Sequence, residues 1–144
     1  PGTLRTVATR RNSFLNLPKT EDPGWTGLSS QEAIRLRVLN FTVTSNHIHL
    51  LVYGSGKPDA IPRSMQLVAG RTAQEFNNRK DRKGAFWEDR YHATAVEANH
   101  HLISCLTYID LNMVCAGVVS HPSEWEFSGY AEIQAPRERY SIID

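Results

Sequence analysis

Residues 38–52 read VLNFTVTSNHIHLLV, and this stretch decides the centre of the fold. Two apolar, β-branched runs, 38–43 and 47–52, flank the polar triplet Thr44-Ser45-Asn46. Such runs favour strands, and a short polar connection between them favours a hairpin. Side chains of a strand alternate between the two faces of its sheet, so His47 and His49 point the same way.

The segments on either side of this hairpin supply the other elements. The sequence predicts strands over 3–9 and 91–97, a short helix opened by the capping box Ser29-Ser30-Gln31-Glu32 and running toward Leu36, and helices over 61–78 and 100–116. Asn99 is placed to cap the last helix and Gly117 to end it. The order strand, helix, strand, strand, helix, strand, helix predicts an α+β, ferredoxin-like (split βαβ) sandwich. Its antiparallel sheet carries helices on one side, plus an added C-terminal helix that contains Tyr108.

The length of the chain, 144 residues, is that of one ordinary domain. We therefore expect a single domain over 1–144, with a loop at 12–28 and an irregular C-terminal extension at 120–144. No apolar run approaches the roughly 18 residues of a membrane span, so no membrane partner is expected. Cys105 and Cys115 are too few for a disulfide framework, which favours a cytoplasmic location.

Charge is unevenly distributed along the chain. Residues 63–90 hold seven basic residues against four acidic, whereas residues 97–144 hold seven acidic and two basic. This asymmetry is compatible with a polyanion bound at one end of the fold. A solvated helix face with a polar loop is the alternative explanation.

The paired imidazoles are the first candidate site. Two histidines on one face of a strand are able to grip one divalent cation, because neutral imidazole is a common metal ligand. The alternative is that His47 and His49 are partly buried or surface residues with ordinary hydrogen bonds.

The last predicted helix supplies further candidates. Its apolar stripe, Leu102, Leu106, Ile109 and Met113, must pack on the sheet. A second stripe of His101, Cys105, Tyr108 and Asn112 runs along its flank. A helix docked beside the histidine strand would present a phenol and an amide to the imidazoles. The alternative is that Tyr108 packs at the margin of the core and that Asn112 is an ordinary residue at the end of the helix.

Three ordered motifs carry a resemblance to a known family. They are Ser45-Asn46-His47-Ile48-His49, then residues 86–94 (FWEDRYHAT), then residues 108–119 (YIDLNMVCAGVV). Together they resemble the single-tyrosine HUH transposases, most closely the insertion-sequence-200-like branch that includes the REP-associated tyrosine transposases. The chain departs from that family at Met113 and Cys115, where proline and arginine are common.

The resemblance implies a catalytic site and a reaction. Tyr108 would be the nucleophile, and His47, His49 and Asn112 would hold Mg²⁺ or Mn²⁺. The implied activity is transposition: cleavage and rejoining of single-stranded DNA at sites that flank a hairpin, through a 5′-phosphotyrosine intermediate. His101, on the same flank as Tyr108, is a further candidate for proton transfer.

The resemblance also implies a DNA partner, and with it a nucleoid-associated location in the cytoplasm, while the candidate contact residues come from the charge distribution. Single-stranded or hairpin DNA is the expected partner. Phosphate contacts are expected from the basic residues of 63–90, and base stacking from two aromatics nearby, for which core packing is the alternative. The full set is Arg63, Arg71, Arg79, Lys80, Arg82, Lys83, Trp87, Arg90 and Tyr91. A homodimer and a monomer are both compatible with the sequence.

Two other functions compete with strand transfer. One is a domesticated module that binds hairpin DNA without cutting it. The other is a metal-dependent hydrolase that uses the two histidines with Asp110 or Glu97. The presence of Tyr108 and of three candidate ligands favours the transferase over both.

Overall fold

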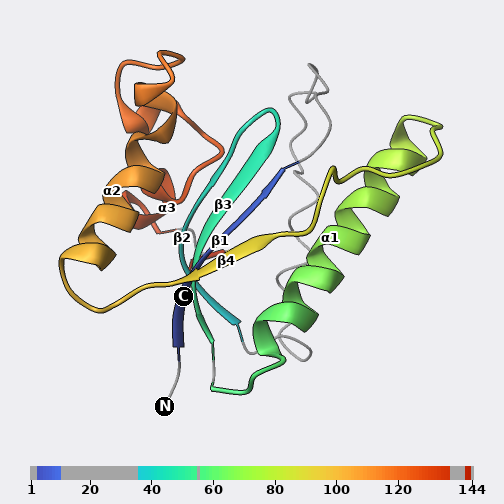
Figure 1. Cartoon of the computed structure of the whole chain (residues 1–144). Coiled ribbons are helices and arrows are strands. Elements are labelled where there is room, and N and C mark those ends of the chain that lie inside the picture. Colours follow the sequence, from blue (N-terminus) through green and yellow to red (C-terminus); the bar gives the residue numbers. More distant parts are fainter. Residues whose placement is uncertain (1–2, 11–35, 55, 137–141, 144) are drawn as a thin grey trace.

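A four-stranded antiparallel sheet forms the centre of the molecule in the computed structural model, which describes residues 3–10, 36–54, 56–136 and 142–143 (Figure 1). The strands are β1 (Thr3–Arg10), β2 (Leu36–Val43), β3 (His47–Gly54) and β4 (His92–Ala95). Their spatial order is β2-β3-β1-β4, and every neighbouring pair is antiparallel. This is the strand order of a ferredoxin-like sandwich, so the predicted fold class is confirmed.

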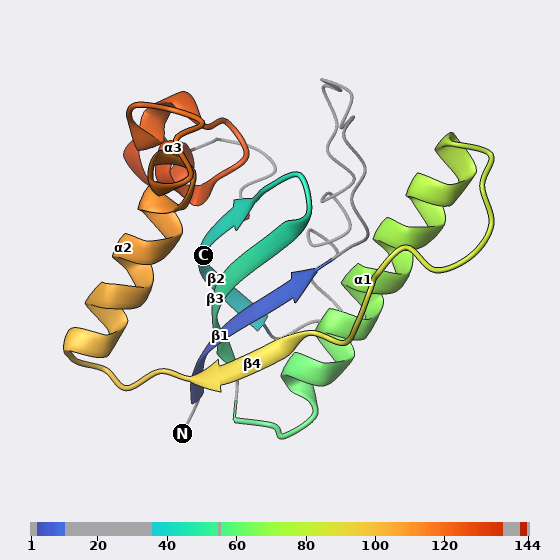
Figure 2. The ribbon, with the colours of Figure 1, turned by 45° about the horizontal axis from the view of Figure 1, so that its top comes forward.

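The two long helices cover opposite faces of the sheet (Figure 2). Helix α1 (Ala60–Arg79) packs Met65 into a cluster with Ile48, Leu50 and Val52 of β3. Helix α2 (His100–Cys115) packs Ile109 against Leu51 on the other face. Strand alternation therefore gives α2 the face to which His47 and His49 belong.

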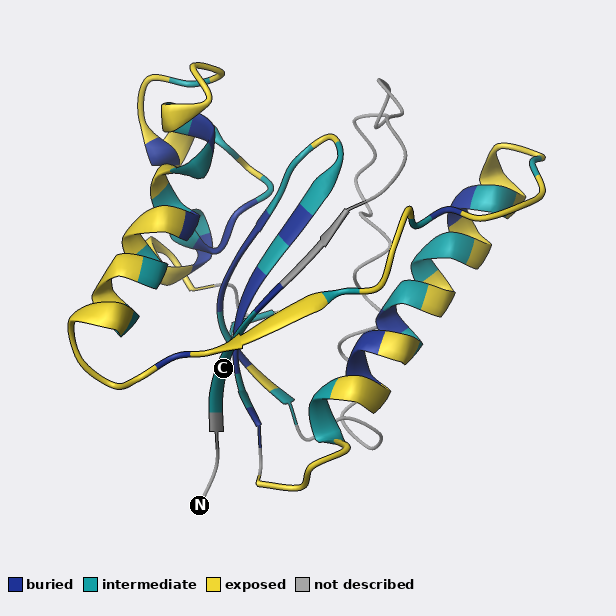
Figure 3. Cartoon of the chain, in the orientation of Figure 1, coloured by how far each residue is buried: buried dark blue, intermediate teal, exposed yellow. Residues whose placement is uncertain are grey.

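The added C-terminal helix thus lies on the face that the predicted sandwich leaves open. Ile109 and Met113 of its predicted apolar stripe are buried, while Leu102 and Leu106 are partly buried beside Leu51. The predicted face of this helix is confirmed, and its outer side is exposed to solvent (Figure 3).

A β-bulge in β2 changes which side chains reach α2. Val38 pairs with Val52, but the next pairing joins Asn40 to Leu51, so Leu39 is the extra residue. A bulge re-aims the side chains that follow it. Asn40 consequently faces α2 rather than α1, and it is fully buried there.

The ends of α2 agree with the sequence only in part. Gly117 has φ of 69°, and the hydrogen bonds from the Gly117 amide to the Val114 carbonyl and from the Val118 amide to the Met113 carbonyl close the last turn. Glycine adopts this left-handed conformation without a steric cost, so its role as terminator is confirmed. Asn99 occupies the N-cap position, but its side chain makes no capping hydrogen bond.

Some predicted boundaries differ from the structure. Strand β4 is four residues long, shorter than the predicted 91–97. Leu36, toward which the capping-box helix was expected to run, is the first residue of β2. The rest of that predicted helix and the predicted loop at 12–28 lie outside the described residues. No helix of the described part is long and apolar enough to cross a membrane.

The prediction of an irregular extension at 120–144 is wrong for the part of this segment that the structure describes. The segment contains a 3-10 turn, η2 (Pro122–Glu124), and a short helix, α3 (Gly129–Gln134). Phe127 and Ser128 pair with the edge of β2, through the hydrogen bond from the Val43 amide to the Phe127 carbonyl. These elements are too short for a periodic apolar pattern and are held by tertiary contacts, which sequence periodicity does not report.

Candidate active site

The two histidines of β3 lie side by side on the α2 face. The rings of His47 and His49 are parallel within 8°, with centroids 5.9 Å apart. Both residues are half-buried, at the end of β3 nearest the β2–β3 turn. The sheet therefore presents two imidazoles to one small volume.

The turn before β3 fixes the orientation of the first imidazole. His47 Nδ1 lies 2.9 Å from Asn46 Oδ1, which accepts hydrogen bonds only, so Nδ1 carries the proton. The His47 amide donates to Thr44 Oγ1 at 2.9 Å, which holds the same turn closed. A protonated Nδ1 leaves the lone pair of Nε2 free for a ligand, as metal-binding histidines require.

The surroundings of the second imidazole favour its neutral form. Burial lowers the pKa of His49 below its usual value of 6.5, and the neighbouring His47 lowers this pKa further. Thr42, the cross-strand partner of His49, is buried, and its hydroxyl has no hydrogen-bond partner among the described residues.

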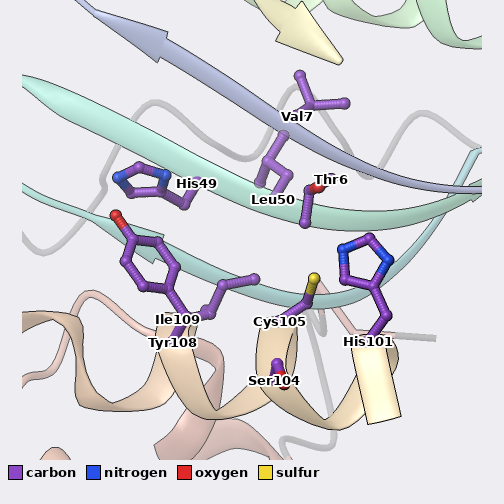
Figure 4. A pocket seen from close by; sticks show the side chains of 9 residues that line it. All are labelled: Thr6, Val7, His49, Leu50, His101, Ser104, Cys105, Tyr108 and Ile109. Carbon is purple, nitrogen blue, oxygen red and sulfur yellow. The ribbon is translucent and has the colours of Figure 1, made fainter. Parts of the chain in front are cut away.

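Helix α2 places Tyr108 against this pair. The Tyr108 and His49 rings meet edge to face, with centroids 5.5 Å apart and an interplanar angle of 88°. The tyrosine remains 57% exposed, and in Figure 4 its hydroxyl points toward the ring of His49. The phenol is thus both beside the imidazoles and open to a large substrate, within one chain.

A partly buried hydrogen bond fixes the rotation of α2 on the sheet. Asn40 Nδ2 donates to Asp110 Oδ1 at 2.8 Å, and Asn40 Oδ1 accepts from the Phe41 amide, also at 2.8 Å. Asp110 lies two residues after Tyr108 and points to β2, away from the flank that carries the phenol. The bulge in β2 is what makes this contact possible.

The donor set suits a divalent cation. His47 and His49 offer neutral nitrogens, and Asn112, one turn after Tyr108 and half-buried, offers an amide oxygen. The described residues contain no group of three His, Cys, Asp or Glu side chains able to hold a metal, so a metal site here would need a third protein ligand of another type. This finding and the engagement of Asp110 with Asn40 argue against the hydrolase alternative.

A cavity of about 420 Å³ opens beside Tyr108, between α2 and the sheet. His49 and Thr6 line it from the sheet, and His101, Ser104, Cys105 and Tyr108 line it from the helix (Figure 4). Three members of the predicted polar flank of α2 therefore share one cavity. In Figure 4, Cys105 lies between Tyr108 and His101, which does not favour direct proton transfer between those two side chains.

The candidate phosphate-binding residues lie on α1, on the loop after it and in the segment before β4. All of these are exposed except Arg82, which is half-buried. Arg63 pairs with Asp59 at 3.3 Å and Arg79 with Glu75 at 3.7 Å, both in helical i,i+4 geometry. Because α1 covers the face opposite α2, the structure does not bring its basic residues to the Tyr108 cavity (Figure 2).

The two candidate stacking residues occupy packing positions. The Trp87 indole N–H donates to the Ala69 carbonyl at 2.9 Å, and its ring meets Phe86 edge to face. Trp87 and Tyr91 are both half-buried against the cluster under α1. This is the core-packing alternative that the sequence left open.

Several residues of the site were not identified from the sequence. Asn46 stood only inside a motif, without a role, and Asn40 and Thr42 lay in an apparently ordinary strand. The polar Asn40 within an apolar run was the one available signal, because a buried amide needs a partner.

Known proteins resemble this chain at two levels. The family model described as "Transposase IS200 like" matches residues 6–112. A solved structure, described as a REP-associated tyrosine transposase bound to a REP hairpin, matches with a TM-score of 0.75 and 19% sequence identity. The match covers 97% of this chain and 83% of that one. No curated protein matches.

Proposed function

Since the chain belongs to the IS200-like transposase family, we propose that it is a metal-dependent DNA strand transferase acting on single-stranded DNA beside a hairpin. The observation that carries the proposal is the position of Tyr108, edge to face with His49 and exposed to solvent in the same chain. A tyrosine in this place is available to DNA, whereas a packing tyrosine would have its hydroxyl covered.

The reaction begins with the Tyr108 oxygen. It attacks the scissile phosphorus and loses its proton, while the bond from phosphorus to the 3′ oxygen breaks and that oxygen takes up a proton. The products are a 5′-phosphotyrosine and a free 3′-hydroxyl. Attack by a second 3′-hydroxyl reverses these steps and joins new DNA ends, so no nucleotide cofactor is consumed.

The residues around the tyrosine prepare this step. His47, His49 and Asn112 would hold Mg²⁺ or Mn²⁺, which supplies positive charge to the phosphate and orients it. Burial, which lowers the pKa of His49, favours a neutral ring able to bind a metal, and the hydrogen bond from His47 Nδ1 to Asn46 leaves His47 Nε2 free to bind one. The hydrogen bond between Asn40 and Asp110 keeps the tyrosine helix docked on the sheet. This keeps the Tyr108 oxygen close to a phosphate held beside the histidines, and such proximity speeds the reaction.

Incubation with a labelled hairpin oligonucleotide that carries single-stranded flanks, with Mg²⁺ or Mn²⁺, tests the proposal. We expect a covalent adduct that survives denaturation, which Tyr108→Phe abolishes. The matched control is Tyr130→Phe, the same chemical change at a half-buried tyrosine of α3, which contacts His121 instead. A non-covalent complex alone would identify a hairpin-binding module, and cleaved product without an adduct would identify a hydrolase. Either result would overturn the proposal.

A further inference from the structure

The cavity beside Tyr108 extends well beyond the groups that the reaction needs. We propose that it receives one unpaired nucleobase, that of the nucleotide next to the scissile phosphate, and so selects the bond that is cut. This inference rests on the proposed function, because it takes Tyr108 as the group that approaches the phosphate.

The position of the cavity fits this role. Its helical wall runs from Tyr108 to His101, seven residues or two turns, which is about 10 Å along an α-helix. Successive nucleotides of a stacked strand are about 3.4 Å apart, and an unstacked strand is longer. A base attached to the nucleotide beside the phosphate therefore reaches the middle of the cavity, where Ser104 and Cys105 lie.

The chemistry of the cavity fits a flat, neutral, partly apolar ligand. Ile109 lines its floor beside the strand positions Val7 and Leu50, whose side chains pack under α1, and no lysine or arginine among the described residues lines it. A phosphate or another anion would lack a charged partner there, whereas a base has two apolar faces that leave water favourably. Its volume also lies within the range, about 300–1,000 Å³, of pockets that bind small ligands.

Polar groups at the rim are able to read the edge of such a base. The His101 ring is exposed and makes no hydrogen bond to any other described residue, so both ring nitrogens are available. The Ser104 hydroxyl donates to the His100 carbonyl at 2.9 Å, which leaves its oxygen free to accept. Bases in single strands expose the edges that such groups recognise.

Two neighbouring positions on α2 provide a matched pair of variants. Ser104 lines the cavity, while Ile103 is 62% exposed and does not line it. Ser104→Trp places a large ring in the mouth of the cavity, and Ile103→Trp adds the same ring to solvent. Because both positions are exposed, both proteins should fold, and circular dichroism checks this.

The experiment measures DNA binding without cleavage. Each protein carries Tyr108→Phe to prevent covalent trapping, and fluorescence anisotropy gives Kd for hairpin oligonucleotides with an abasic site at each flanking position in turn. In the parent and in Ile103→Trp, we expect one abasic position to weaken binding about tenfold, the scale of one lost stacking contact. In Ser104→Trp the intact oligonucleotide should bind about tenfold more weakly, and the abasic site should add less than a twofold change.

The results separate the two proposals. The sensitive position should adjoin the bond that the protein with Tyr108 intact cleaves. An equal abasic effect in the two tryptophan variants, or no sensitive position, would overturn the base pocket even if the adduct forms. The protein with Tyr108 intact could form no adduct while one abasic position still weakens binding in Ile103→Trp and not in Ser104→Trp. That result would overturn the strand-transfer reaction and would support the base pocket. A protein that binds no DNA would overturn both.

Discussion

The hydrogen bond between Asn40 and Asp110 is expected to be a major contributor to the docking of α2. Asn40 is 0% exposed, so Asp110→Ala leaves a buried amide donor without a partner. Such an orphan costs about 1–3 kcal/mol, and because the aspartate is partly solvated we expect about 2 kcal/mol of unfolding free energy to be lost. Asn40→Ala should cost about 3 kcal/mol, since the Phe41 amide loses its acceptor too.

A double-mutant cycle tests this reasoning. Urea unfolding, followed by circular dichroism, gives the free energy for each protein. The double variant should be less destabilised than the sum of the single variants by about 1.5 kcal/mol, because both single changes break the same bond. Leu111→Ala, on the same helix and 37% exposed, is the control and should cost less than about 1 kcal/mol. A coupling energy indistinguishable from zero would refute the reasoning.

The same variants should change the reaction more than DNA binding. Asp110 is two residues from Tyr108, so a loosened helix displaces the phenol from His49. A displacement of about 1 Å is sufficient to lower a reaction rate up to a hundredfold. We expect Asp110→Ala to form the adduct at least about tenfold more slowly while its Kd for DNA changes little. Equal losses in rate and in affinity would indicate a general structural defect instead.

Three further changes give independent tests. Because the pKa of His49 is lowered in the fold, the unfolded state binds more protons than the folded state below pH 6.5. The free energy of unfolding, measured with a chelator present, should therefore fall as the pH decreases below that value. The fall should be smaller in His49→Gln. Asn46→Ala should weaken Mn²⁺ binding about tenfold by calorimetry, whereas Asn46→Asp, which still accepts from His47 Nδ1, should retain it; equal losses would exclude this orienting role. Gly129→Ala should destabilise the fold by about 1–3 kcal/mol in urea, because its methyl group would overlap side-chain atoms of Asn40 and Ile143; an unchanged midpoint would contradict that packing.

Periodicity was sufficient to predict most of the fold. The hairpin 38–52, helix α1 and the apolar stripe of α2 depend on alternation and on helical spacing, which are local properties of the chain. The bulge at Leu39 and the short elements after residue 120 depend on tertiary contacts: the hydrogen bond to Asp110 and the pairing of Ser128 with Thr42. No local pattern encodes such contacts, and the polar Asn40 within an apolar run was the one sign of them.

The candidate site could be predicted only in part, again from strand alternation and helical spacing. Alternation placed both histidines on one face, and helical spacing placed Tyr108, Cys105 and His101 on one flank. The contact between that face and that flank needed the fold, which now brings Tyr108 to His49. The roles of these residues in binding metal and cutting DNA stay predictions.

The most direct test of the account locates the covalent bond. After reaction with a hairpin oligonucleotide and nuclease trimming, trypsin is expected to release the peptide 91–137, which contains Tyr91, Tyr108 and Tyr130. Fragmentation in the mass spectrometer distinguishes these three tyrosines. The account predicts a nucleotide attached through its 5′ phosphate to Tyr108 alone. A nucleotide on either of the other two tyrosines, or a peptide that carries none while the DNA is cut, would contradict it.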